Sequence, residues 1–203
     1  MFGFAGTVVG IRCSDGVVIA SDTRSTMGYL VLSKSSRKVF KIQDNLGATI
    51  SGVAGDVQGF VDMLKAETNL YRLREERAMS PEAVSQLASA ILHTRRGFPL
   101  LVSAIIAGVD GTGPRLFFID AVGGKLEDEN FAAGGTGESV AYGVLEQGYA
   151  DGMSVKDGLK LAANSISGAI QRDAATGDKI MVAKIDKNGY QELSEGEVEG
   201  LLK

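Results

Sequence analysis

The sequence predicts an α+β fold in which two antiparallel β-sheets are sandwiched between layers of helices. Stretches with strand and helix periodicity follow one another in the order strands, two helices, strands, two helices, strands. Tight polar turns join neighbouring strands, which indicates antiparallel pairing within each sheet. The 203 residues contain no linker or low-complexity segment, so we expect a single domain over residues 7–203, preceded by a short head or propeptide over residues 1–6.

The first half of the chain contains four expected strands and two expected helices. The turn Ser14-Asp15-Gly16 separates two β-branched, apolar runs and predicts a hairpin. Apolar positions at helical spacing predict a helix over residues 55–76. Ser80-Pro81 predicts the start of a second helix, because serine caps helices and proline suits the first helical position; Gly97 ends it. The expected strands are 7–13, 17–22, 38–42 and 47–53.

The second half repeats this order of elements. A strand pair is expected around the turn 110–114, and shorter strands follow it. Ser154 is the expected N-cap of the helix predicted over residues 154–174. The expected strands are 101–109, 115–121, short strands near 124–133, 180–186 and 190–193. The expected helices are 138–149, 154–174 and a closing helix at 195–202.

Composition and charge exclude several classes of function. A net charge of -4, with no basic run beyond Arg95-Arg96, argues against nucleic-acid binding. One histidine, His93, and one cysteine, Cys13, supply no ligand cluster, so we expect no metal and no cofactor. The single cysteine favours a reducing cytosol, and no stretch is long and apolar enough to span a bilayer. Residues 1–6 lack the features of a signal peptide, so we expect a soluble cytoplasmic chain.

Thr7 is the candidate nucleophile. A threonine at a free N-terminus attacks a carbonyl with its hydroxyl, and its own α-amine accepts the proton. That amine has an ordinary pKa of about 7.7–8.0, which a nearby lysine lowers further by like-charge repulsion. Lys38 and Asp22 are the nearest candidates for this lysine and for a carboxylate that holds it in place. The site requires a chain cut just before the threonine.

The turn after the first strand decides which side chains share a sheet face with Thr7. A two-residue turn at Asp15-Gly16 would set Val9 opposite Asp22. Thr7 would then lie opposite Arg24 and on the same face as Asp22. A turn that differs by one residue reverses this arrangement. The competing interpretation is an edge-strand threonine beside a charged strand end, and these residues alone favour it.

Two other motifs have weaker functional interpretations. The run 134–139 enters a helix and could hold an anion, but it lacks the third glycine of a dinucleotide fingerprint and the lysine of a P-loop. We therefore interpret this run as a tight turn that carries hydroxyl groups and lies near another site. Asp173 and Thr176 offer a carboxylate and a hydroxyl, although a helix end capped by Gly177 is the simpler interpretation. With His93 the only histidine, an N-terminal amine is the favoured base.

The order and spacing of several motifs identify a family. These motifs are Gly10-Ile11, Asp15-Gly16-Val17-Val18-Ile19-Ala20, Asp22-Thr23-Arg24, Arg37-Lys38, Ser51-Gly52-Val53-Ala54-Gly55-Asp56, Gly135-Thr136-Gly137, Tyr142-Gly143-Val144-Leu145-Glu146, Arg172-Asp173 and Thr176-Gly177. From about Gly6 to its C-terminus, the chain resembles the β-type subunits of the proteasome core particle, especially archaeal ones. The resemblance implies the four-layer αββα sandwich of N-terminal-nucleophile hydrolases, which agrees with the expected order of elements.

The same resemblance implies a threonine-type peptide-hydrolysing site. Lys38 would be the cationic partner of the N-terminal amine, and Asp22 would hold that lysine. Gly52 would donate a backbone N–H to the oxyanion. The supporting hydrogen-bond cluster would consist of Thr136, Asp173 and Thr176. Active members usually carry serine in place of these two threonines, so the hydroxyls are kept.

This chain departs from the family pattern at the position of the nucleophile. Counted back from Gly10 and Asp22, the family's N-terminal threonine falls on Gly6 rather than on Thr7. A slip of one residue turns a strand side chain to the opposite face. The segment 67–77 also looks like the corresponding helix of a non-catalytic eukaryotic β-type subunit.

Two functions therefore stay open. In the first, self-cleavage after Gly6 exposes Thr7 as an active nucleophile. In the second, the chain is a catalytically weak or inactive β subunit that completes the ring and supports maturation of an active β partner. An isolated αββα hydrolase or binding domain is disfavoured by the full-length match.

The resemblance also implies the partners. These would be proteasome α-type subunits, other β-type subunits in a seven-membered ring, unfolded polypeptide substrates and, indirectly, a regulatory ATPase. The implied role is ATP-dependent intracellular protein degradation, with no nucleic-acid or membrane partner.

Overall fold

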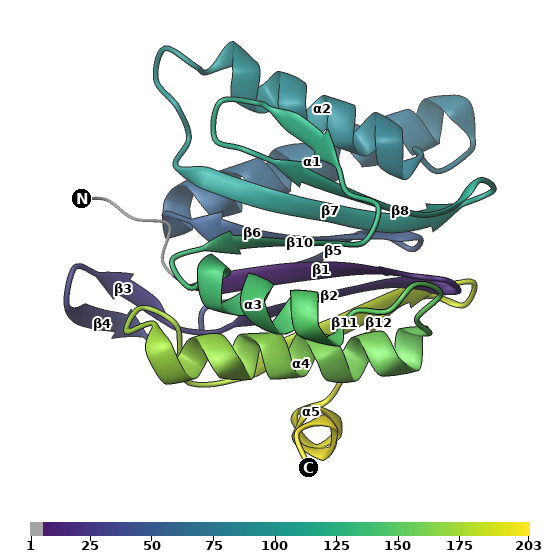
Figure 1. The fold of residues 1–203 in the computed structure, drawn as a ribbon. Coiled ribbons are helices and arrows are strands. Elements are labelled where there is room, and N and C mark those ends of the chain that lie inside the picture. The colour runs from purple at the N-terminus through teal and green to yellow at the C-terminus, as the bar shows by residue number, and fades with distance from the viewer. Residues whose placement is uncertain (1–5) are drawn as a thin grey trace.

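The computed structural model describes residues 6–203, which form two stacked five-stranded antiparallel sheets between two pairs of helices (Figure 1). This arrangement confirms the predicted four-layer sandwich. The first sheet contains, in spatial order, β10 (Phe131–Gly135), β1 (Thr7–Cys13), β2 (Gly16–Asp22), β11 (Ile180–Asp186) and β12 (Gly189–Glu192). The second contains β5 (Val39–Gln43), β6 (Leu46–Gly52), β7 (Val102–Asp110), β8 (Gly113–Ile119) and β9 (Lys125–Glu127).

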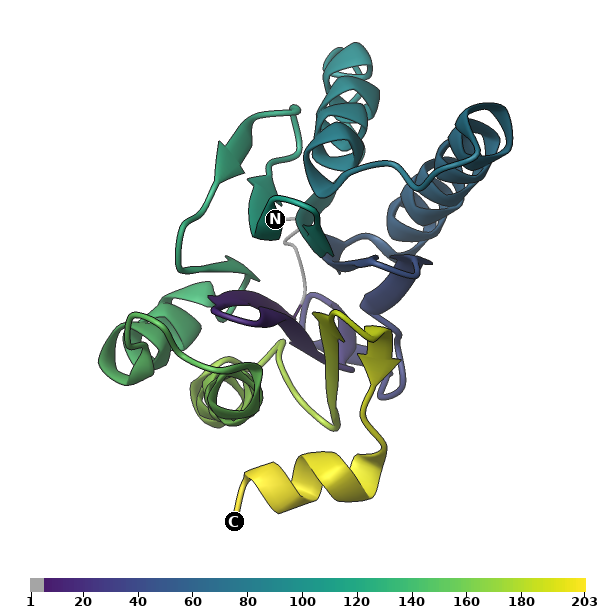
Figure 2. The same ribbon diagram turned by 90° about the vertical axis from the view of Figure 1, so that its right-hand side faces the viewer.

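Helices cover the outer face of each sheet (Figures 1 and 2). The helices over the second sheet are α1 (Ala54–Glu75) and α2 (Pro81–Thr94). Those over the first sheet are α3 (Glu138–Gly148) and α4 (Val155–Arg172), and α5 (Glu195–Leu201) packs outside α4. Ser80 and Ser154 cap α2 and α4 by accepting bonds from backbone N–H groups, as predicted. None of the helices within residues 6–203 is both long and apolar enough to cross a membrane.

The β1–β2 turn differs from the turn considered in the sequence. Cys13 pairs with Gly16 and Val9 pairs with Ala20, so the turn residues are Ser14 and Asp15 and the placement of Val9 opposite Asp22 is wrong. The Asp15 carboxylate accepts the N–H of Val155, which ties the turn to the start of α4. This register differs from the considered one by two residues, so Thr7 and Asp22 still share a face.

Three apolar layers hold the sandwich together and orient β1. Val9 and Ile11 face α3 and α4, whereas Val8 faces Ile105 and Leu116 in the layer between the sheets. Each fully buried side chain of this size stabilises the fold by about 1.5–3 kcal/mol. Because side chains alternate along a strand, Thr7 shares the helix-facing side with Val9.

Two local features were not predicted correctly. A separate two-stranded hairpin, β3 (Ser25–Met27) and β4 (Leu30–Ser33), follows β2 and was not expected from the sequence. The glycine cap assigned to Gly177 is wrong, because α4 ends at Arg172 with Asp173 as its C-cap residue. The N–H of Gly177 instead donates to Asp22, which draws the segment after α4 back towards β2.

Candidate active site

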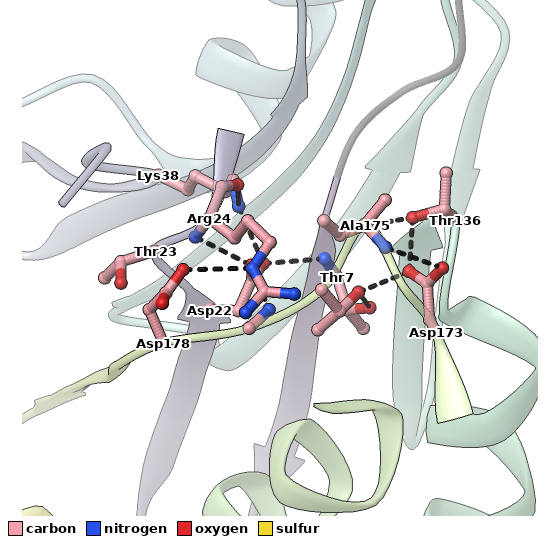
Figure 3. A network of polar contacts seen from close by, with 12 residues as sticks. Thr7, Asp22, Thr23, Arg24, Lys38, Thr136, Asp173, Ala175 and Asp178 are labelled. Atoms are coloured by element: carbon pink, nitrogen blue, oxygen red, sulfur yellow. Dashed lines mark hydrogen bonds and ion pairs between the residues drawn. The ribbon is translucent and has the colours of Figure 1, made fainter. Parts of the chain in front are cut away.

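The candidate site lies where the N-terminal end of β1 meets the C-terminal end of β2 (Figure 3). Lys38, directly before β5, approaches from the second sheet, and the segment that follows α4 closes the other side. Segments that lie far apart in the sequence thus meet at Asp22 and Thr7 (Figure 3).

Asp22 is the centre of the first hydrogen-bond network. Its Oδ1 accepts the backbone N–H of Thr7 at 2.8 Å and the ammonium of Lys38 at 2.7 Å. Its Oδ2 accepts the N–H groups of Arg24 at 2.9 Å and Gly177 at 3.0 Å. The residue is fully buried, so these four donors replace the water that its carboxylate loses.

Lys38 is a buried cation with a specific partner. Its side chain is 8% exposed and donates to Asp22 and to the carbonyl of Arg24, at 2.6 Å. Burial lowers the pKa of the Lys38 ammonium below its ordinary value, and the attraction of Asp22 opposes that shift. The structure thus places Lys38 in direct contact with Asp22, the carboxylate that the sequence analysis paired with it.

A second network gathers the predicted supporting residues around Asp173. The hydroxyls of Thr136 and Thr176 both donate to its Oδ2, each at 2.5 Å. The hydroxyl oxygen of Thr176 lies 2.7 Å from that of Thr7, and both residues are buried. The carbonyl of Gly6 accepts the N–H of Thr136 at 2.9 Å and lies 3.3 Å from the Thr136 hydroxyl, whose one proton is shared with the much closer Asp173. The structure therefore brings Thr136, Asp173 and Thr176 together, with Thr7 as their fourth member.

Position 6, and not position 7, faces the Lys38–Asp22 pair. A Cβ atom built on Gly6 would collide with the ammonium of Lys38 and the carboxylate of Asp22. Gly6 also has φ +86°, a conformation that residues with side chains rarely adopt. The hydroxyl of Thr7 lies against Gly137 and Thr176 instead, where no part of it is exposed to solvent. Figure 3 shows Thr7 between the two networks.

Gly52 and Lys38 line one cavity of about 470 Å³. Its walls include apolar residues from β5, β6 and α1, among them Phe40, Ile50 and Val57. Gly52 has φ +155° and packs so closely on the carbonyl of Leu101 that no side chain fits there. Of the Lys38–Asp22 pair, Lys38 is the residue that lines this cavity.

Arg24 and Asp178 complete the site and were not assigned a role from the sequence. Arg24 Nε donates to Asp178 at 3.0 Å, and Nη1 donates to the carbonyl of Ala174 at 3.0 Å. These bonds hold the segment after α4 in the conformation that presents Asp173 and Gly177. Arg24 belongs to the Asp22-Thr23-Arg24 motif of the family. No local sequence pattern marks Asp178 as a site residue, because its contact with Arg24 forms only when the loop after α4 is folded.

The remaining candidates take structural positions. Gly135 ends β10 and pairs with Thr7, and Thr136 and Gly137 connect β10 to α3, so the run 134–139 contains a tight turn beside Thr7. His93 is exposed, with Nδ1 3.3 Å from the carbonyl of Val122. Within residues 6–203, no group of three or more histidine, cysteine, aspartate or glutamate side chains is arranged to hold a metal ion.

Comparisons with known proteins agree on one family. Residues 4–185 match the family described as proteasome subunit. The chain is 41% identical over 197 residues to the proteasome subunit beta of Methanothrix thermoacetophila, which covers 97% of this chain and 95% of that protein. It is 42% identical over 196 residues to that of Methanohalophilus mahii, with coverages of 97% and 93%. For Methanocaldococcus vulcanius the identity is 44% over 197 residues, with coverages of 97% and 88%.

Proposed function

This chain belongs to the proteasome subunit family as a β subunit of the core particle, and we propose that it takes its place there without a nucleophile of its own. Family membership implies association with other proteasome subunits. The site retains the Lys38 ammonium with the Asp22 carboxylate, the two supporting threonine hydroxyls and the cavity beside Lys38. What this chain lacks is a side chain at position 6.

One observation carries the proposal: the residue that faces Lys38 and Asp22 is Gly6. In a threonine-type site the lysine must lie close to both the amine and the hydroxyl of the nucleophile, so that it can lower the proton affinity of the amine. Here the Thr7 hydroxyl is turned to Thr176 and is sealed from solvent. A substrate carbonyl in the cavity beside Lys38 would meet no hydroxyl at that position.

The proposed role is therefore structural and supportive. The chain would complete a seven-membered β ring stacked on α-type rings and help an active β partner to mature. The active partner would cleave unfolded polypeptides delivered by a regulatory ATPase in the cytoplasm. Residues 1–6 would stay attached as a head on the domain formed by residues 7–203, because the Thr7 hydroxyl is not presented for self-cleavage.

A second candidate function is supported by one specific feature. The Gly6 carbonyl accepts the backbone N–H of Thr136 at 2.9 Å, and the Thr7 hydroxyl connects through Thr176 to the Asp173 carboxylate. These contacts would polarise the Gly6–Thr7 bond and lead a proton away from the hydroxyl. Thr7 would then be exposed by self-cleavage and act as nucleophile, with Lys38 and Asp22 beside its new amine.

Substitution of Thr7 separates the two candidates. Thr7→Val removes the hydroxyl while keeping the shape of the side chain, and particles that contain it should hydrolyse a fluorogenic peptide at the wild-type rate. The matched control replaces the N-terminal threonine of the active β partner, which should abolish turnover. If Thr7→Val particles of unchanged subunit composition hydrolyse the peptide more slowly than wild-type particles, the second candidate is favoured.

A further inference from the structure

The turn between β11 and β12 contains a chemically labile pair of residues. Asn188 is followed directly by Gly189, and none of the other four asparagines of the chain precedes a glycine. The backbone nitrogen after an asparagine can attack the side-chain amide carbon of that asparagine and expel ammonia. A side chain on the following residue hinders this approach, whereas glycine leaves it open and lets the backbone rotate. The Asn188-Gly189 pair is therefore the candidate for a spontaneous covalent change.

The fold leaves this pair accessible to water. Asp186 pairs with Gly189 across the turn, so Lys187 and Asn188 are the two connecting residues, and both are exposed. The backbone N–H of Asn188 donates to Asp186 Oδ1 at 2.7 Å. Within residues 6–203, no residue outside this turn forms a hydrogen bond with the Asn188 side chain. The side-chain amide is thus free to turn towards the nitrogen of Gly189.

The fold protects the other asparagines, which are Asn45, Asn69, Asn130 and Asn164. Asn69 and Asn164 lie inside α1 and α4, where the N–H of the following residue is bonded within the helix. The side chain of Asn45 donates to the carbonyl of Val109 at 3.0 Å, and the next residue begins β6. Asn130 directly precedes β10 and its bulky first residue, Phe131. Each of these four would have to break regular structure, or pass a side chain, to react.

We propose that Asn188 is a site of spontaneous deamidation in the folded chain. The nitrogen of Gly189 gives up its proton to water and forms a bond with the side-chain carbon of Asn188. The bond from that carbon to the side-chain nitrogen breaks, and ammonia leaves. Water then opens the resulting cyclic imide at either of its two carbonyls, which gives aspartate or isoaspartate at position 188. The net reaction exchanges ammonia for water and needs no oxidant or reductant.

The isoaspartate product would disturb the strand that follows the turn. Among the described strands, β12 is an edge strand that pairs with β11 alone. The N–H of Tyr190 donates to the carbonyl of Asp44 at 2.7 Å, which joins β12 to the turn between β5 and β6. Further along β12, Glu192 forms an ion pair with Arg37. Isoaspartate adds a methylene to the backbone before Gly189, so β12 would shift against the second sheet and both contacts would weaken.

The labile turn and the candidate site lie at opposite ends of the first sheet (Figure 1). Asp22 is the last residue of β2 and Gly16 is the first, and Gly16 pairs with Asp186 beside the turn. A strand of this length spans about 20 Å. The reaction at Asn188 therefore uses none of the residues of the candidate site and is independent of the function proposed above.

Peptide mapping of the assembled particle tests this modification. The particle is incubated at neutral and at mildly alkaline pH, and the digested chain is analysed by chromatography and mass spectrometry. We expect the peptide that contains Asn188 to become one mass unit heavier and to separate into an aspartate and an isoaspartate form. The change should be faster at alkaline pH, because the attacking nitrogen must lose its proton. The peptides that contain Asn45 and Asn164 should stay unchanged.

Two results would overturn the inference. One is an unmodified Asn188 in the native chain after a time in which the denatured chain is fully converted. The other is earlier conversion of any other asparagine in the native chain. Asn188→Gln is the matched control, because it keeps a neutral amide but would have to close a larger ring, and its peptide should gain no mass.

Hydrogen exchange separates the effect of the longer backbone from that of the new charge. In chains that carry isoaspartate, the N–H of Tyr190 should exchange about tenfold faster than in fresh wild type, because its bond to Asp44 is weakened. Freshly prepared Asn188→Asp has the same added charge with a normal backbone and should exchange at the wild-type rate. Unchanged exchange in the isoaspartate chains would contradict the predicted shift of β12.

Discussion

The ammonium of Lys38 occupies the space into which a side chain at Gly6 would project. This relationship supports the proposal that the site keeps its lysine and carboxylate without a nucleophile of its own. Because position 6 has no side chain, the Lys38 ammonium can donate hydrogen bonds to Asp22 and to the carbonyl of Arg24. These bonds compensate its positive charge without an N-terminal group.

Gly6→Ala should destabilise the fold. The added methyl group would collide with Lys38, and the residue would have to hold φ +86°, so we expect a loss of about 1–3 kcal/mol in the free energy of unfolding. Chemical denaturation measures this loss. Gly111→Ala is the matched control, because Gly111 has open space around it, and it should change stability by only a few tenths of a kcal/mol. Equal stability of the two variants would show that position 6 does not face Lys38.

Asp22→Ala should cost more stability than Lys38→Met. The first change leaves a buried ammonium without its carboxylate and frees three backbone N–H groups, a loss of about 3–5 kcal/mol. The second change leaves Asp22 with those three backbone donors still in place. The double variant should lose less than the sum of the two single losses, which a double-mutant cycle of unfolding free energies measures. Additive losses would mean that the two side chains do not interact.

Cys13 should be unreactive in the folded chain. Burial, together with the charges of Asp15 and Asp157, raises the pKa of its thiol from 9.0 to about 12. A shift of this size lowers the thiolate fraction at pH 8 by about a thousandfold, and the thiolate is the reactive form. Labelling by a thiol reagent should therefore be slow in buffer and rapid in denaturant. Rapid labelling of the native chain would contradict the buried position of this side chain.

The same shift predicts a pH dependence of stability. Above pH 9 the unfolded thiol ionises while the folded thiol keeps its proton, so the folded state binds more protons. The contribution of Cys13 to the free energy of unfolding is therefore present below pH 9 and declines as the pH rises towards 12. Denaturation of the wild type and of Cys13→Ala at pH 8 and pH 10.5 should show a steeper decline for the wild type. Parallel declines would remove Cys13 as the cause.

Most of the fold followed from local patterns in the sequence. The β-branched, apolar run 7–13 and the helical spacing of 55–76 predicted elements that the structure contains. A strand buried on both faces is apolar almost throughout, whereas a helix buried on one face carries apolar residues at helical spacing. The β3–β4 hairpin was missed since its strands are short and their apolar side chains are exposed, so no burial pattern marks them. The β1–β2 turn depended on a contact from Asp15 to the start of α4, far away in the sequence.

The candidate site was predictable in part. Asp22, Lys38 and Thr176 were singled out from family motifs, and the structure places them in two networks that share Thr7. Their spacing alone did not decide which face Thr7 presents, because that depends on strand register. The bond from Gly177 to Asp22 had no sequence signal, and a helix cap was the simpler local interpretation.

The intact mass of this chain, taken from assembled particles, tests the central claim most directly. If Gly6 stands where the nucleophile belongs and Thr7 faces away, the chain has no means of cutting itself before Thr7. The account predicts a mass that includes Gly6, with no added mass after treatment with an electrophile directed at N-terminal threonine. A chain that begins at Thr7 and carries the electrophile would contradict it.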